Sequence, residues 1–457
     1  MQISWDSRIV VLAAVMVLLI ACLWRLALRE RHAIHMRGVL LNGRTRRRGS
    51  QLIGRDSGVL TVAGVAIPPL DETKHFKFIG STGTGKSTAI RELLRKAIAR
   101  GDRAVFADPD GGYCREFHQR YRGDIILNPF EAESVKWDLF GEIRSSYDGE
   151  QLAGALVPDC EDTSAREWRA YARTFLAAII RQCHARGARN AADLWRLLTI
   201  ASAEELRPWV AGTAAQPFLD ADNARMFGSI RAVLTSAIAA FEFVLAQRAS
   251  AFSVRRWICD LGQCGNLFIP YRAGQIAALK SMIAAWMRLA IFEAMSQPEG
   301  RDQHLWFVVD ELDALGAIDG LKDALARLRK FGGRCVLGFQ SVSQVSTVYG
   351  QGPAQAIIEN CGNTLILRCS GSEQGGTSQF ASRLIGDREV VRLQTSRGRD
   401  REGPLLGKGG RRSRNVTEQR ATETAVMPSE LEQLPDLAGY LKTASSPTWR
   451  RVALTPF

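Results

Sequence analysis

One eight-residue segment limits the possible folds of this chain more than any other part of the sequence. Residues 80–87 read GSTGTGKS, which is the GxxxxGK[ST] pattern of a phosphate-binding loop. Alternating residues at 75–79 predict a strand before the loop, and the spacing of residues 87–100 predicts a helix after it. Because strand, glycine loop and helix in this order form the context that the motif requires, we expect a P-loop nucleotide-binding domain.

The residue types in the loop give each position a task. Glycines let the backbone turn its N–H groups onto the β-phosphate at the start of the helix. Lys86 would reach the β- and γ-phosphates, and the hydroxyl of Ser87 would bind Mg²⁺. The alternative is a glycine turn beside a surface lysine, which the flanking strand and helix disfavour. The predicted ATP-binding residues are Gly80, Ser81, Thr82, Gly83, Thr84, Gly85, Lys86, Ser87 and Thr88.

A second motif would complete the chemistry of ATP hydrolysis. Asp310 and Glu311 directly follow the apolar run 305–309, which is the arrangement of a Walker B motif. Asp310 would hold Mg²⁺, and Glu311 would activate the attacking water. Acidic pairs at strand ends also cap helices, so this motif gains its weight from the P-loop that precedes it.

Two further polar residues are catalytic candidates. Gln340 ends a predicted strand at 335–339, where it could sense the γ-phosphate and the water. Arg329 precedes the sequence Phe-Gly-Gly at 331–333 and could act as an arginine finger in a neighbouring subunit's site. The alternative for Arg329 is a solvated cation at a helix end, stabilised by the helix dipole, and spacing alone favours this alternative.

Short apolar runs closed by turn residues predict buried parallel strands on both sides of a long helical stretch. Inside that stretch, Ser164 and Ser202 each precede a glutamate by three residues and are expected to cap helices. The basic, glycine-rich residues 388–420 are expected to form a mobile loop. The predicted segments are 1–30 (transmembrane anchor), 31–70 (basic juxtamembrane segment and first strand), 71–141 (nucleotide-binding domain, first part), 142–255 (all-helical insertion) and 256–457 (nucleotide-binding domain, second part).

The N-terminal region and the charge of the chain suggest its surroundings. Residues 9–24 carry no charge and are followed by many arginines, which predicts one membrane span with the rest of the chain on the cytoplasmic side. A cleaved signal peptide or a buried core helix are the alternatives. The net charge of +13 favours polyanionic partners, either nucleic acid or anionic lipid. The nine cysteines form no CxxC pair, which favours plain thiols over a metal site.

Several motifs together resemble one protein family. The segments GSTGTGKSTAIRELLRKAIARGD (80–102), DIILNPFEAESVKWDLF (124–140), LWFVVDEL (305–312), RKFGGRCVLGFQS (329–341) and LPDLAGY (434–440) are similar to TraD/TraG-type coupling proteins of conjugative type IV secretion systems, in particular to the TraD branch. The similarity extends from about residue 70 to the end of the chain.

The resemblance implies a RecA-like P-loop motor with an inserted all-helical domain, anchored in the inner membrane and assembled as a hexamer. It implies an ATP- and Mg²⁺-dependent pump that binds single-stranded DNA without sequence preference. The partners would be a relaxase and inner-membrane components of the secretion channel. It also matches Arg329 to the family's trans-acting arginine. Family members usually have two membrane spans, whereas we expect one here.

Two other functions remain open at this point. An FtsK-type DNA translocase would share the motor and the anchor. A membrane receptor that recruits protein substrates would use ATP for assembly, with the helical insertion as its docking surface. Stimulation of ATPase activity by single-stranded DNA would separate a pump from such a receptor.

Overall fold

The computed structural model describes Met16 and residues 33–42, 58–160, 162–260, 262–299, 304–372, 375–399 and 412–456. The predicted N-terminal span lies outside these residues apart from Met16. The chain divides into two compact units. Unit 1 contains residues 1–41 and 382–427, and unit 2 contains residues 42–381 and 428–457.

The core of unit 2 is a mostly parallel sheet. Its strands are β5 (Phe76–Ile79), β6 (Arg103–Pro109), β7 (Ile125–Ile126), β10 (Leu267–Tyr271), β11 (Leu305–Val309), β12 (Gly333–Phe339), β13 (Asn363–Ile366), β16 (Ala438–Lys442) and β17 (Thr448–Ala453). Their order is β17-β16-β13-β5-β12-β11-β6-β10-β7. The strands from β13 to β7 run parallel, and the C-terminal strands β16 and β17 add an antiparallel edge. The runs predicted from apolar residues therefore form one sheet.

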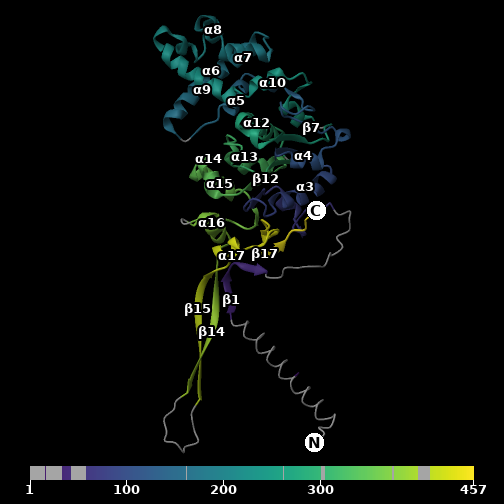
Figure 1. Cartoon of the computed structure of the whole chain (residues 1–457), viewed down its shortest axis with the longest axis vertical. Helices are drawn as coiled ribbons and strands as arrows, with labels where there is room; N and C mark the ends of the chain where they lie inside the picture. Colours follow the sequence, from purple (N-terminus) through teal and green to yellow (C-terminus); the bar gives the residue numbers. More distant parts are fainter. Residues whose placement is uncertain are drawn as a thin grey trace, which may run out of the picture. The chain divides into compact units, whose positions relative to one another are not determined.

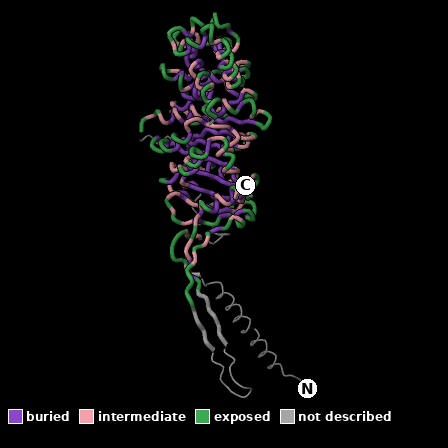
Figure 2. The backbone as a smooth tube through the Cα atoms, turned by 90° about the vertical axis from the view of Figure 1, so that its left-hand side faces the viewer, coloured by how far each residue is buried: buried purple, intermediate pink, exposed green. Residues whose placement is uncertain are grey.

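Helices flank this sheet, and Figure 2 shows that many residues in the middle of unit 2 are buried. The strands are apolar on both faces, as in Leu305–Val309, whose five residues are all buried. Short elements complete this part of the chain: β2 (Leu40–Asn42), at the boundary between the units, β3 (Thr61–Val62) and β4 (Val65–Ala66). The helices are α2 (Pro69–Glu72), α3 (Lys86–Ala99), α4 (Gly112–Phe117), α12 (Ala273–Met295), α13 (Leu321–Leu328), α14 (Val342–Tyr349), α15 (Gln351–Glu359), α16 (Gly376–Ile385) and α17 (Pro428–Glu432).

A helical segment is inserted between β7 and β10. Its helices are α5 (Asp148–Leu156), α6 (Thr163–Ala185), α7 (Ala191–Thr199), α8 (Ala203–Val210), α9 (Ala224–Ile238), α10 (Phe241–Ala246) and α11 (Val254–Cys259). Figure 1 shows α6 to α9 gathered at the end of unit 2 away from β17. The chain enters and leaves the segment through two adjacent parallel strands, β8 (Lys136–Trp137) and β9 (Ala251–Phe252), so the range 142–255 is not entirely helical.

The two predicted helix caps had different outcomes. Ser202 caps α8, because its side chain accepts a hydrogen bond from the backbone N–H of Glu205. Ser164 is not a cap: α6 begins at Thr163, directly after Asp162, whose carboxylate accepts from the backbone N–H of Ala165 at 2.7 Å. The carboxylate at 162 is an equally good cap and stands earlier in the chain, so the helix starts there.

Unit 1 corrects a second expectation. The described parts of 388–420 are strands instead of a mobile loop, and residues 400–411 lie outside the described residues. Strand β14 (Asp387–Arg399) pairs antiparallel with β15 (Arg412–Thr424), and β1 (Ala33–Gly38) pairs with β14. Arg388 stands directly opposite Glu423 in this register and forms an ion pair with it at 2.9 Å. Arg392 binds the same carboxylate at 2.5 Å. Cross-strand pairs of this kind stabilise a ribbon, although composition alone suggests disorder.

Among the described residues, α12 is the one helix that is long and apolar enough to cross a membrane. A little over half of its most apolar window is buried inside the fold. It packs on the α5 and α11 helices as well as on the sheet. A core helix of a globular domain has the same properties, so α12 gives no support for a membrane span.

Candidate functional site

The site is assembled where neighbouring parallel strands end. Register pairs Phe339 of β12 with Ile79 of β5, and Leu337 with Val309 of β11. The residues that follow these strands, Gly80, Asp310 and Gln340, therefore meet at one edge of the sheet. Ligands of open α/β sheets bind at this carboxyl edge.

The P-loop has the backbone geometry that its glycines predict. Gly85, which precedes α3, has φ of 113°, a conformation that side chains rarely adopt. One hydrogen bond within the loop and one from the C-terminal part of the chain stabilise it. Thr84 Oγ1 donates to the carbonyl of Ser81 at 2.7 Å, and the backbone N–H of Leu437 donates to the carbonyl of Thr84 at 3.0 Å. Ser87 and Thr88 lie in the first turn of α3. The start of α3 thus faces the position expected for the phosphates.

The predicted metal ligands lie together. Ser87 Oγ donates to Asp310 Oδ2 at 2.6 Å, although the two residues are 223 positions apart. Asp310 is 4% exposed, and its other oxygen, Oδ1, is buried without a hydrogen-bond partner among the described residues. A buried carboxylate oxygen without a donor is costly unless it binds a cation. A hydroxyl and a carboxylate are hard oxygen ligands, so these residues fit Mg²⁺.

The predicted base and sensor also meet. Gln340 accepts a hydrogen bond from Thr82 Oγ1 at 2.8 Å through its Oε1, and its Nε2 is 3.5 Å from Glu311 Oε1. Burial raises the pKa of Glu311, and the carboxylates of Asp310 and Asp313 raise it further. A raised pKa brings a carboxylate closer to the basicity that proton abstraction from water requires. Gln340 links the loop to this carboxylate.

Lys86 is buried within the loop that it serves. Its Nζ donates to the carbonyls of Gly80 at 2.7 Å and Ser81 at 3.2 Å. Burial lowers the pKa of Lys86, and the nearby carboxylates of Asp310 and Glu311 partly offset this effect. The ammonium group is therefore placed beside the loop backbone and the acidic pair, where a phosphate would lie.

Comparison with known proteins adds to this geometry. A family model described as the type IV secretion-system coupling protein DNA-binding domain matches residues 59–455. The chain belongs to the coupling-protein family. The coupling protein TraD of Escherichia coli K12 is 30% identical over 399 residues, which cover 85% of this chain. The resemblance seen in the motifs is thereby confirmed.

Solved structures of another coupling protein, TrwB, have the same fold. The unbound form of TrwB lacking 70 N-terminal residues superposes with a TM-score of 0.79 at 32% identity, covering 92% of this chain and 94% of that one. TrwB has also been solved with ADP and Mg²⁺, with equal TM-score and identity. The RecA-like P-loop fold with a helical domain is thus confirmed, and the predicted cofactors ATP and Mg²⁺ agree with these complexes. This coupling protein spans about half the length of TraD, at 53%.

The structure separates one predicted site residue of this coupling protein from the others. Arg329 lies in a short 3-10 helix, Arg329–Phe331, immediately before β12 begins. The P-loop follows the carboxyl end of β5, which runs parallel to β12. Because Arg329 precedes β12, it lies at the opposite edge of the sheet from Lys86, and its side chain is exposed. Within one copy it is not brought to the nucleotide site.

One residue of the site was missed in the sequence. The hydroxyl of Tyr113 donates to Asp310 Oδ2 at 2.7 Å. Tyr113 lies in α4, which starts after the turn Asp108–Gly111 at the end of β6. The sequence did show a turn directly after a predicted strand. It could not show that this strand, β6, lies next to the Walker B strand β11, because strand order is not visible in a single sequence.

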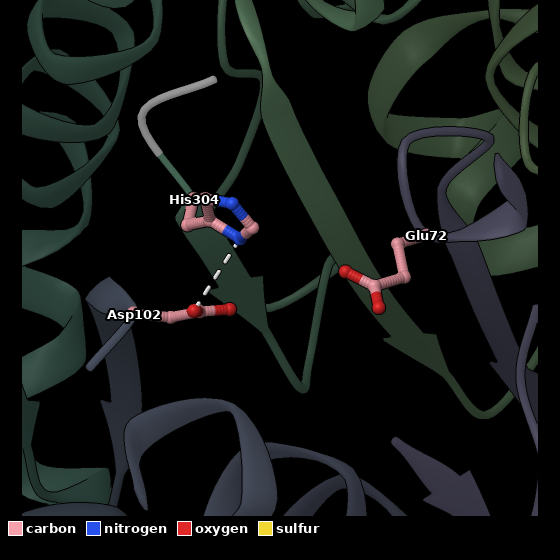
Figure 3. Close-up of side chains that lie close together, drawn as sticks. All are labelled: Glu72, Asp102 and His304. Carbon is pink, nitrogen blue, oxygen red and sulfur yellow. Dashed lines mark ion pairs between the residues drawn. The ribbon is translucent and has the colours of Figure 1, made fainter. Parts of the chain in front are cut away.

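A second acidic group lies at the amino edge of the same sheet. Side-chain ligand atoms of Glu72, Asp102 and His304 all lie within 4.8 Å of one another, and Asp102 is 3.4 Å from the His304 ring, as the dashed line in Figure 3 shows. Arg100 binds both carboxylates, at 2.8 Å from Glu72 and 2.6 Å from Asp102. Arg334 adds a contact with Glu72 at 3.1 Å. Two cations already balance the two carboxylates, so this group is an ion-pair network and does not fit a metal ion.

Proposed function

We propose that the chain hydrolyses ATP to move DNA for a conjugative type IV secretion system. The observation that carries this proposal is the contact of Ser87 with Asp310, two oxygen ligands suited to Mg²⁺ that meet beside the P-loop, in a fold shared with TrwB. Bound MgATP would supply the phosphoanhydride bond and the charge that polarises it. The net charge of +13 supports a polyanionic substrate.

The residues divide the work at this site. Lys86 and the loop N–H groups bind the phosphates, and Ser87 with Asp310 holds the metal. Glu311 accepts a proton from water, and Gln340 orients this carboxylate and reports on the loop through Thr82. Arg329 of one copy would complete the site of the next copy, because its own site is out of reach. This arrangement requires a ring, for which we propose a hexamer.

The finer assignments follow from the family. We propose that the DNA is a single strand carrying a relaxase, and that the motor delivers it to inner-membrane components of the secretion channel. The N-terminal segment would anchor the chain in the inner membrane with the motor in the cytoplasm. TraG and TraD are described as conjugal transfer and coupling proteins, which supports this setting.

The test is the ATPase rate of the full chain in detergent, with and without a single-stranded oligonucleotide. We expect DNA to raise the rate, and this stimulation to weaken steeply with salt because phosphate contacts release counterions. Glu311→Gln should retain nucleotide binding but reduce turnover about 100-fold or more. A wild-type rate that DNA leaves unchanged at low salt would contradict the pump and favour a receptor that uses ATP for assembly.

A mixing experiment addresses Arg329. Arg329→Ala and Lys86→Ala subunits are each expected to be inactive alone. When they are mixed, each can lend its intact half-site to a neighbour, so part of the activity should return. If mixtures of any ratio stay inactive while both variants still assemble with wild-type subunits, Arg329 does not act between copies.

A further inference from the structure

The feature that the proposed mechanism has not used is the buried hydroxyl of Tyr113. Tyr113 is 1% exposed, and its hydroxyl donates to Asp310 Oδ2 at 2.7 Å. The same oxygen accepts from Ser87 Oγ at 2.6 Å. A carboxylate oxygen offers two lone-pair directions, so two donors fill Oδ2 and leave Oδ1 as the open acceptor.

The ring of Tyr113 is fixed by contacts on several sides. Its backbone N–H donates to Asp108 Oδ1 at 2.9 Å, which ties α4 to the end of β6. Its ring stacks on Phe106 with centroids 5.5 Å apart. The guanidinium of Arg91, on α3, lies over the ring at 5.4 Å from its centroid. Tyr113 is therefore a rigid donor, supported by β6 on one side and by the helix that follows the P-loop on the other.

We propose that Tyr113 is a positioning residue that orients the Asp310 carboxylate for the metal. By holding Oδ2 beside Ser87, it fixes the rotation of the carboxylate, whose Oδ1 lies close to Gly338 of β12. Asp310 would otherwise be free to rotate its carboxylate about the terminal bond, because that torsion is broad in aspartate. Outer hydrogen bonds of this kind commonly strengthen metal binding 10- to 100-fold. This inference rests on the proposed function only in taking Asp310 as a metal ligand.

A purely structural role predicts something different. Buried tyrosine hydroxyls usually find some acceptor, and Asp310 could serve merely as that acceptor. Loss of the hydroxyl would then lower stability and leave metal affinity unchanged. Metal affinity, and not activity or stability, is the property that separates the two roles.

The test variant is Tyr113→Phe, which removes the hydroxyl and keeps the ring that stacks on Phe106. We expect the affinity for Mn²⁺, measured by electron paramagnetic resonance with ADP present, to weaken about 10-fold. The affinity for ADP without metal should stay within about twofold. ATP turnover should fall at low Mg²⁺ and recover at high Mg²⁺, since the metal site is weakened and not removed.

Tyr349→Phe is the matched control. Tyr349 is half-buried, and its hydroxyl accepts a hydrogen bond from the backbone N–H of Ile318 at 3.2 Å. It is expected to lose a similar amount of stability and to keep wild-type Mn²⁺ affinity. Near-ultraviolet circular dichroism verifies that both variants retain native packing.

The outcomes separate this inference from the proposed function. If the wild-type chain binds neither ADP nor Mn²⁺ with ADP, the proposed function itself is wrong. If the wild type binds both and Tyr113→Phe binds Mn²⁺ equally well, Tyr113 has only a structural role. A loss of Mn²⁺ affinity that Tyr349→Phe shows to the same degree would likewise overturn the proposal, because the effect would then follow from lost stability.

Discussion

At the amino edge of the central sheet Glu72 and Asp102 face an arginine, whereas at the carboxyl edge Asp310 faces two hydroxyl groups. Glu72 and Asp102 are bound by Arg100 and buried almost completely. Asp310, at the other edge, accepts two hydroxyl donors and forms no ion pair with any described residue. The same residue types therefore serve two ends: paired charge stabilises the fold, and unpaired charge is available for a ligand.

Removing one cation from each edge should affect different properties: ATP turnover at the carboxyl edge and the free energy of unfolding at the amino edge. At the carboxyl edge, Lys86→Ala removes the charge that faces the phosphates. We expect ATP turnover to fall about 100-fold or more, because a preorganised donor to the phosphates is lost. Unfolding by urea should change little, since Lys86 makes hydrogen bonds only to loop carbonyls. A variant that keeps its ATPase rate would contradict the assignment of this edge.

At the amino edge, Arg100→Ala leaves two buried carboxylates short of a partner. We expect a loss of about 2–3 kcal/mol in the free energy of unfolding, somewhat below the range for a fully buried pair because Arg100 is partly exposed. Nucleotide affinity of the folded protein should be unchanged. Arg120→Ala breaks the exposed pair with Glu133 and should cost less than about 1 kcal/mol. Equal losses in the two variants would remove the distinction between paired burial and surface charge.

The pH dependence of stability should have opposite signs at the two edges. Burial raises the pKa of Asp108, at the carboxyl edge, to about 6. Its stabilising contribution is thus present in acid and is lost as pH rises through about 6. Burial also acts to raise the pKa of Asp102, but hydrogen bonds from His304, Arg100 and Trp306 outweigh it and lower that pKa. The contribution of Asp102 is therefore present at neutral pH and lost as pH falls below its unfolded value.

Urea unfolding of Asp108→Asn and Asp102→Asn between pH 3 and 7.5 measures this contrast. The stability of Asp108→Asn relative to wild type should rise between about pH 4 and 6, by at most about 1.4 kcal/mol per pH unit, and level off above pH 6. The deficit of Asp102→Asn should stay level at neutral pH and shrink only toward pH 3. Parallel curves for the two variants would show that the edges do not differ in charge.

The sequence predicted the carboxyl edge well and the amino edge not at all. Glycine spacing and an acidic pair after an apolar run are local signals, so the loop and the Asp310–Glu311 pair could be found. Glu72, Asp102 and Arg334 meet only through strand pairing, which brings together residues more than 200 positions apart. Tyr113 was missed for the same reason. In the β14–β15 hairpin, the charge that opposes Arg388 is 35 residues away, so the basic composition suggested a loop.

The paired strands β8 and β9 have a consequence for how such a motor can diversify. Beside them, one buried carboxylate clasps the two ends of the helical insertion: Glu142 accepts from the backbone N–H groups of Val254 at 2.7 Å and Arg255 at 3.0 Å. The chain thus leaves the sheet domain and re-enters it at the same place. The insertion can therefore differ in length or sequence without moving the strands that carry the nucleotide site.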